Sequence, residues 1–194
     1  MGLATGKKRQ DRKYSYTDYI SWPAGDRWEI IDGEAWNMTP APTTRHQAIV
    51  FNLTVTLGAE IKKGPCVPFV APTDVVFDEY NIVQPDFLVI CDKGKITPAN
   101  VQGTPNLIVE VISLSTRIKD VREKRKLYER FGVKEYLIFY PDDEMVERFR
   151  LVAGRYEAAD VFNWDETLTL YTFPELTLNL WQIFEKDLPE VEGL

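Results

Sequence analysis

The sequence predicts an α/β domain in which helices flank a mixed β-sheet. Two long segments, residues 42–63 and 115–132, have the three-and-four spacing of apolar residues that an amphipathic helix requires. Short segments of strand length, rich in Val, Ile, Leu and Phe, lie between and after them. One of these, residues 106–112, is apolar on both faces, which is typical of a central strand covered on two sides. Helices and buried strands in this arrangement form layered α/β folds.

Length and composition favour one domain. The chain has 194 residues, 44% hydrophobic and 27% charged, which suits a single soluble domain with its own core. We expect residues 14–194 to form this domain, and residues 1–13, which hold five Lys or Arg, to form a flexible basic tail. The apolar runs are too short to span a bilayer, and the N-terminus lacks the apolar stretch of a secretory signal. We expect a cytoplasmic protein.

The N-terminal third begins with two short elements. Residues 15–23 predict a short helix that Pro23 ends. Residues 27–38 predict a β-hairpin, because Asp32 and Gly33 form a turn pair between two apolar runs.

The first long helix follows at residues 42–63. Its apolar residues recur at intervals of four, Thr44 is the candidate N-cap, and Gly64 follows the helix. These apolar residues are Ile49, Leu53, Leu57 and Ile61.

The remaining elements alternate strands with one further helix. Residues 66–77 and 84–90 predict strands separated by a turn at 78–81, and residues 106–112 predict the central strand. The segment at residues 115–132 predicts a second long helix, with a cap residue at its start and Gly132 at its end. A strand-rich second half follows, with predicted strands at residues 135–140, 145–151 and 155–162.

The residue inventory excludes several classes of site. Cys66 and Cys91 predict two small core residues in a reducing compartment, not a disulfide framework. One histidine, His46, cannot build an HExxH zinc site, and the sequence has no G-x-S-x-G elbow, Walker A loop or G-x-G-x-x-G fingerprint. An enzyme with this sequence must therefore use carboxylates and lysine.

A single carboxylate interrupts the most apolar strand. Alternate residues of a strand share a face, so Glu110 lies with Ile108 and Ile112, while the residues between them face the other way. An ionised carboxylate in such a place costs several kcal/mol unless it is paired or binds a cation. Glu110 therefore needs a partner from another element.

The helix at residues 115–132 offers that partner. Val121, Lys124, Tyr128 and Phe131 follow one another at spacings of three, four and three, so they form one stripe that packs on the sheet. Asp120 precedes Lys124 by four residues on the same side. The two open interpretations are a catalytic pair, and a structural arrangement in which Lys124 extends its ammonium to solvent and Glu110 makes a buried salt bridge.

A second strand adds another carboxylate. Asp86 follows Pro85 at the start of the strand at residues 84–90, on one face with Leu88 and Ile90. Two carboxylates at the ends of successive strands, followed by a helix lysine, predict a site for a hard cation. Oxygen ligands of this kind suit Mg²⁺ or Mn²⁺.

These residues resemble the PD-(D/E)XK nuclease superfamily, which has the restriction-endonuclease-like fold. The chain is most similar to its bacterial Uma-two family, through "WEIIDGEAWNMTPAPTTRHQ", "VQPDFLVI", "PNLIVEVISLST" and "KDVREKRKLYERFGVKEYLIFYP", over residues 14–180. The resemblance implies a metal-dependent endonuclease that hydrolyses phosphodiester bonds in DNA. It also implies nucleic acid as the partner, no membrane, and a homodimer as the candidate assembly.

The resemblance also implies roles for residues. Asp86, Glu110 and the backbone carbonyl of Val111 would hold Mg²⁺ or Mn²⁺, and Lys124 would orient or deprotonate the attacking water. The third motif of the superfamily has lysine two residues after the glutamate, where this sequence has Ile112. Lys124 matches a lysine that the following helix supplies in this branch. Glu34 is a candidate further acid, with a surface position as the alternative.

The charge distribution leaves the functional class open. The net charge of −7 argues against bulk attraction to nucleic acid, although residues 117–130 hold seven Lys or Arg against three Asp or Glu. The basic residues off the apolar stripe would either contact phosphates or form a solvated helix face: Arg122, Arg125, Lys126 and Arg130. His46 would contact substrate or cap a helix. Two alternatives to a nuclease remain: an inactive nuclease-fold binding protein, and a hydrolase of small phosphorylated molecules.

Overall fold

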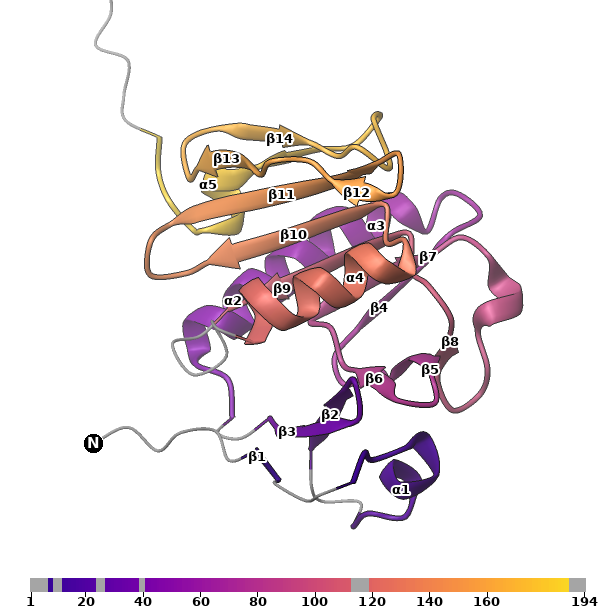
Figure 1. Ribbon diagram of the computed structural model, residues 1–194. Helices are drawn as coiled ribbons and strands as arrows, with labels where there is room; N and C mark the ends of the chain where they lie inside the picture. Colours follow the sequence, from indigo (N-terminus) through magenta and orange to yellow (C-terminus); the bar gives the residue numbers. More distant parts are fainter. Residues whose placement is uncertain (1–6, 9–11, 24–26, 39–40, 113–118, 189–194) are drawn as a thin grey trace, which may run out of the picture.

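Two β-sheets organise the fold, as the computed structural model shows (Figure 1). The structure describes residues 7–8, 12–23, 27–38, 41–112 and 119–188. We call the two sheets the central sheet and the N-terminal sheet. The described helices include none that is long and apolar enough to cross a membrane.

The central sheet is mixed, as predicted. β9 pairs in parallel with β10, whereas β7 with β9 and β10 with β11 are antiparallel. Across the sheet the strands are β12 (Arg155–Tyr156), β11 (Met145–Val152), β10 (Glu135–Tyr140), β9 (Leu107–Val111), β7 (Phe87–Ile90) and β4 (Val67–Val70), with β13 (Asp160–Asn163) also on β11. The segment predicted as the central strand, β9, lies in the middle of this order.

The N-terminal sheet contains the predicted hairpin. Asp32 and Gly33 adopt positive φ angles of 53° and 82°, which a tight two-residue turn requires. In order, the strands are β1 (Lys7–Lys8), β3 (Glu34–Asn37), β2 (Trp28–Ile31), β6 (Asn81–Val83), β5 (Val75–Asp78) and β8 (Val101–Gln102). Lys7 and Lys8, which we expected in a flexible tail, thus pair with β3; most of the remaining tail lies outside the described residues.

One face of the central sheet is covered by the first long helix. This helix comprises α2 (Thr44–Leu53), a π-helical stretch (Thr54–Gly58) and α3 (Ala59–Ile61). Its predicted apolar stripe packs in one buried cluster with Leu107, Val109 and Val111 of β9. The N-cap is Thr43, not Thr44 as predicted, because the Thr43 hydroxyl accepts a hydrogen bond from the backbone of His46 at 3.2 Å.

The opposite face is covered by the second long helix (Figure 1). A π-helical stretch (Lys119–Lys124) continues into α4 (Arg125–Phe131), and Gly132 ends the helix at φ 79°. Leu127 and Tyr128 pack in a second cluster with Ile108 and Ile112. The two faces of β9 are therefore covered as predicted, while the predicted start of this helix lies outside the described residues.

Several smaller elements complete the fold. α1 (Tyr16–Ile20) begins at Ser15, which forms a capping box with Asp18. A separate pair of strands, β14 (Thr167–Thr169) and β15 (Thr177–Asn179), precedes α5 (Leu180–Ile183).

Two local predictions need correction. The segment at residues 66–77 is not one continuous strand, because its halves β4 and β5 join different sheets. Cys66 and Cys91 form a disulfide bond and are not free core residues. The antiparallel pairing of Val67 with Ile90 explains this bond, because it brings the cysteines that flank these residues opposite each other.

Candidate active site

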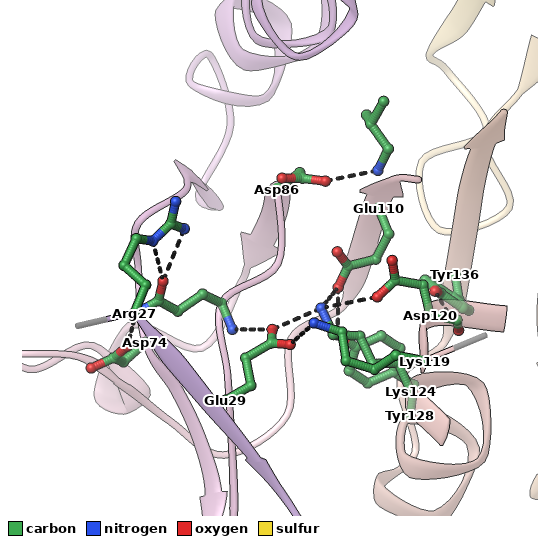
Figure 2. Close-up of polar contacts among 12 residues, drawn as sticks. Arg27, Glu29, Asp74, Asp86, Glu110, Lys119, Asp120, Lys124, Tyr128 and Tyr136 are labelled. Carbon is green, nitrogen blue, oxygen red and sulfur yellow. Dashed lines mark hydrogen bonds and ion pairs between the residues drawn. The ribbon is translucent and has the colours of Figure 1, made fainter. Parts of the chain in front are cut away.

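Glu110 lies on β9 with only 3% of its surface exposed. Its Oε1 accepts hydrogen bonds from the Lys124 ammonium and from the Tyr128 hydroxyl, both at 2.7 Å. Its second carboxylate oxygen points toward Asp86 (Figure 2). One oxygen is thus held by the helix, and the other is directed toward the second predicted carboxylate.

Lys124 reaches Glu110 from the stripe of the second long helix that faces the sheet. Its side chain is 1% exposed, and its Nζ lies 2.7 Å from Glu110 Oε1, 2.7 Å from Glu29 Oε1 and 3.4 Å from Asp120 Oδ1. Burial alone would lower the pKa of Lys124, but these three carboxylates outweigh burial and raise the pKa well above its usual range. The lysine is therefore a buried cation held by anions.

Asp86 immediately precedes β7, next to the end of β9. Its Oδ2 accepts a hydrogen bond from the backbone nitrogen of Val111 at 2.8 Å and lies 3.2 Å from Nε2 of His46. The backbone of Val111 and the ring of His46 therefore fix the position of this carboxylate. Asp86 and the backbone of Val111, which the family resemblance assigns to one site, are in direct contact through the Val111 nitrogen.

The predicted site residues meet at one cavity of about 500 Å³. Its wall includes Asp86, Glu110, Val111 and Lys124, together with His46. The remaining polar lining is Arg27, Thr43, Arg45, Gln47, Lys119, Asp120 and Asp142, and apolar residues such as Met38, Pro72 and Ile112 complete it. The structure thus brings together the carboxylates and the lysine that the sequence singled out.

Glu29 is an important residue of this region that we did not predict. It lies on β2, is fully buried, and accepts from Lys119 at 2.5 Å in addition to its contact with Lys124. The backbone nitrogen of Gln84 donates to it at 2.9 Å. The available signal was the same as for Glu110: one carboxylate inside an otherwise apolar strand.

Glu34, the acid that we considered instead, is exposed at the start of β3. It follows the hairpin turn, and it is absent from the described cavity lining. The hairpin does supply an acid to this region, but from its other strand.

Carboxyl groups outnumber ammonium groups among the buried contacts around Lys124. Four carboxyl groups and two ammonium groups, those of Lys119 and Lys124, are linked by ion pairs or act electrostatically on Glu110, while Arg27, Arg45 and Asp142 also line the cavity. The carboxyl groups belong to Glu29, Asp86, Glu110 and Asp120. Burial raises the pKa of Glu110 well above its usual range; the ammonium of Lys124 opposes this rise, and the carboxylates of Asp120, Asp86 and Glu29 add to it.

The pKa of Glu29 is shifted in the opposite direction from that of Glu110. Burial alone would raise the pKa of Glu29, but the ammonium groups of Lys119 and Lys124 outweigh burial and lower that pKa to about 2. Glu29 is therefore a permanent anion near neutral pH, whereas Glu110 is the carboxyl group that a further cation would help to ionise.

The donor chemistry fits a hard divalent cation. Carboxylate oxygens of Asp86 and Glu110 are the ligands that Mg²⁺ and Mn²⁺ prefer, and a cation held between them would offset the repulsion between these two carboxylates. In the described part of the chain, no three His, Cys, Asp or Glu side chains form a ready metal site. A cation held by Asp86 and Glu110 would therefore also need backbone or water oxygens.

The predicted basic patch lies elsewhere. Arg122 pairs with Glu123 at 3.2 Å, Arg125 lies over the ring of Phe149, and Arg130 donates to Asp32 at 2.7 Å. These arginines and Lys126 are exposed and absent from the described cavity lining, where the arginines are Arg27 and Arg45. Much of the basic helix face is therefore solvated or paired locally.

Comparisons with known proteins agree with this architecture. The sequence model of the Uma2 family, described as "Putative restriction endonuclease", matches residues 16–180. A crystal structure described as "a putative nuclease belonging to DUF820 from Anabaena variabilis ATCC 29413" is similar in fold, with a TM-score of 0.74 and 17% identity. The similarity covers 88% of this chain and 97% of that one. No curated protein matches the sequence.

Proposed function

Because the chain belongs to the Uma2 family of restriction-endonuclease-like proteins, we propose that it is a metal-dependent endonuclease that hydrolyses phosphodiester bonds in DNA. The observation that carries the proposal is the buried contact between Lys124 and Glu110, at a cavity that also contains Asp86. A lysine and two carboxylates at one cavity form the residue set that phosphodiester hydrolysis by this superfamily needs.

The residues have distinct proposed roles. Asp86, Glu110 and the backbone carbonyl of Val111 would hold Mg²⁺ or Mn²⁺, which would supply Lewis acidity toward the phosphate and lower the pKa of bound water. Lys124 orients the attacking water and offsets the negative charge that develops on the phosphate. The cavity gives the scissile phosphate access to these groups.

Three neighbouring groups orient the carboxylates of this arrangement. His46 and the backbone nitrogen of Val111 contact the same oxygen of Asp86, which fixes the orientation of that carboxylate. Tyr128 does the same for Glu110 through its hydroxyl. Partners of this kind orient metal-binding carboxylates and are as important as the ligands themselves.

The test is incubation of the purified protein with supercoiled plasmid and with linear single-stranded and double-stranded DNA, in Mg²⁺, in Mn²⁺ and in EDTA. We expect cleavage that requires the metal and is lost in Glu110→Gln. Absence of cleavage of every DNA substrate, while a small phosphodiester is hydrolysed, would favour the small-molecule hydrolase. Absence of both activities would favour the inactive binding protein.

A further inference from the structure

Glu29 contacts the site only through lysines, and we infer that it is a positioning residue that anchors Lys124 when the cation engages Glu110. The inference rests on the proposed function, because it concerns the metal-bound form of the same site. It assigns a role in that site to the N-terminal sheet, which carries Glu29 on β2.

Lys124 is shared between two carboxylates. Its Nζ lies 2.7 Å from Glu29 Oε1 and 2.7 Å from Glu110 Oε1, so neither partner is closer (Figure 2). Glu110 belongs to β9 of the central sheet, and Glu29 belongs to β2 of the N-terminal sheet. The ammonium group therefore joins the two sheets.

The charges around Lys124 change when Glu110 binds a cation. The negative charge of Glu110 is then drawn toward the cation, and the cation and the ammonium of Lys124 repel each other at short range. A lysine that is 1% exposed is poorly screened by solvent from this repulsion. Without a second anion, the side chain of Lys124 would have to move away, or the cation would bind weakly.

Glu29 is placed to serve as this second anion beside Lys124. It is fully buried and absent from the described cavity lining, whereas Lys119 and Lys124 both reach the cavity. It therefore lies behind the lysines, outside the cavity lining. It acts on the site through the ammonium groups that it holds.

Glu29 is itself fixed in place. The backbone nitrogen of Gln84 donates to Glu29 Oε1 at 2.9 Å, and the Gln84 side chain contacts Asp74 at 2.8 Å and Arg27 at 3.0 Å. Lys119 binds the other oxygen of Glu29. An anchor with this many partners does not follow Lys124 if the ammonium is displaced.

The test is a double-mutant cycle on Mn²⁺ affinity, measured by isothermal titration calorimetry on the full chain without DNA. The variants are Glu29→Gln, Lys124→Met and the double variant. We expect Glu29→Gln to weaken Mn²⁺ binding roughly tenfold, which corresponds to about 1.4 kcal/mol. We expect most of that loss to disappear in the Lys124→Met background, because no ammonium is left to repel the cation.

Glu135→Gln is the matched control. Glu135 is also fully buried, but its carboxylate accepts hydrogen bonds from the backbone nitrogens of Tyr171 and Thr172. Neither of these two residues lines the cavity. Its loss removes a buried charge and should leave Mn²⁺ affinity unchanged. A purely structural effect of losing a buried glutamate would instead appear in both variants.

The outcomes separate the two proposals. If the parent protein binds no Mn²⁺, the proposed function fails. If the parent binds Mn²⁺ and Glu29→Gln has the same effect with and without Lys124, Glu29 does not act through Lys124 and the inference fails alone. Should Glu29→Gln not fold, Glu29→Asp gives a second test: it keeps the charge but withdraws the carboxylate from Lys124, so Mn²⁺ should bind more weakly, and unchanged binding would overturn the inference.

Discussion

The ammonium of Lys124 lies 2.7 Å from Glu110 although the two residues are separated by 14 positions and belong to a helix and a strand. In the proposed function, this contact would supply the positive charge that the superfamily motif places at the position of Ile112. Ile112 is 5% exposed and packs in the apolar cluster that contains Ile108 and Tyr128. The helix delivers the positive charge that the strand lacks.

Lys124→Ala should lower kcat for DNA cleavage by about 10²- to 10⁴-fold with little change in DNA affinity, because the ammonium acts mainly in the transition state. Lys124→Arg should restore little activity, since the guanidinium is a rigid fork with a different reach. The measurement is single-turnover cleavage with Mn²⁺, with the exposed Arg125→Ala as control. Equal rates for the parent and Lys124→Ala would remove Lys124 from the mechanism.

Glu110→Gln should abolish Mn²⁺ binding and leave the metal-free protein as stable as the parent or slightly more stable. The amide keeps an oxygen that can accept from Lys124 and Tyr128, while it removes a carboxyl group that burial disfavours. Thermal unfolding with and without Mn²⁺ measures both effects: at a hundredfold excess over Kd, the ion should stabilise the parent by about 2.7 kcal/mol and the variant not at all. Unfolding of the variant together with no binding by the parent would make Glu110 a structural salt-bridge residue.

Stability at acid pH should depend on Glu29. The lysines lower the pKa of Glu29 from 4.5 to about 2, so the stabilisation is complete above pH 4.5 and is lost as the pH falls toward 2. We expect the difference in unfolding free energy between the parent and Glu29→Gln to shrink by about 3 kcal/mol across that interval. Urea unfolding at several pH values measures it, and a difference that does not vary with pH would contradict the ion pairing.

Arg45 should contribute to DNA affinity and the basic helix face should not. Arg45 lines the cavity at the start of α2, so Arg45→Ala should weaken DNA binding and reduce its dependence on salt by about one unit of slope. Lys126→Ala, on the exposed face of α4, is the control and should change neither. Fluorescence anisotropy with a labelled oligonucleotide in Ca²⁺ or EDTA, over a range of salt, distinguishes the two. The reverse pattern would restore the helix face as the binding surface.

The sequence predicts the parts of this site that lie on regular elements. Strand alternation places Glu110 with Ile108 and Ile112, and helical spacing places Lys124 on the stripe that faces the sheet; both arrangements are present. The family, with its restriction-endonuclease-like fold, is confirmed by the match over residues 16–180. Metal, DNA, the homodimer and the cytoplasmic location stay predictions.

The sequence did not reveal what depends on contacts between distant elements. Glu29 and Glu34 belong to one hairpin; the apolar neighbours of Glu29 mark it as buried, but its place beside the lysines depends on the packing of β2 beside β6. The disulfide between Cys66 and Cys91 likewise depends on the pairing of β4 with β7, which has no local signature. Pairings between strands far apart in the chain therefore limit the prediction.

The contact of Glu29 with Lys119 and Lys124 also has a consequence for folding. Glu29 is fully buried on β2, so the N-terminal sheet cannot reach its native burial with this charge unpaired without a cost of several kcal/mol. Lys119 would lose this partner if β2 were absent, while Lys124 would keep Glu110 and Asp120. The ion pairs of Glu29 therefore couple the N-terminal sheet to the rest of the molecule, and we expect the two sheets to unfold together in one cooperative transition, with no stable state in which only one is formed.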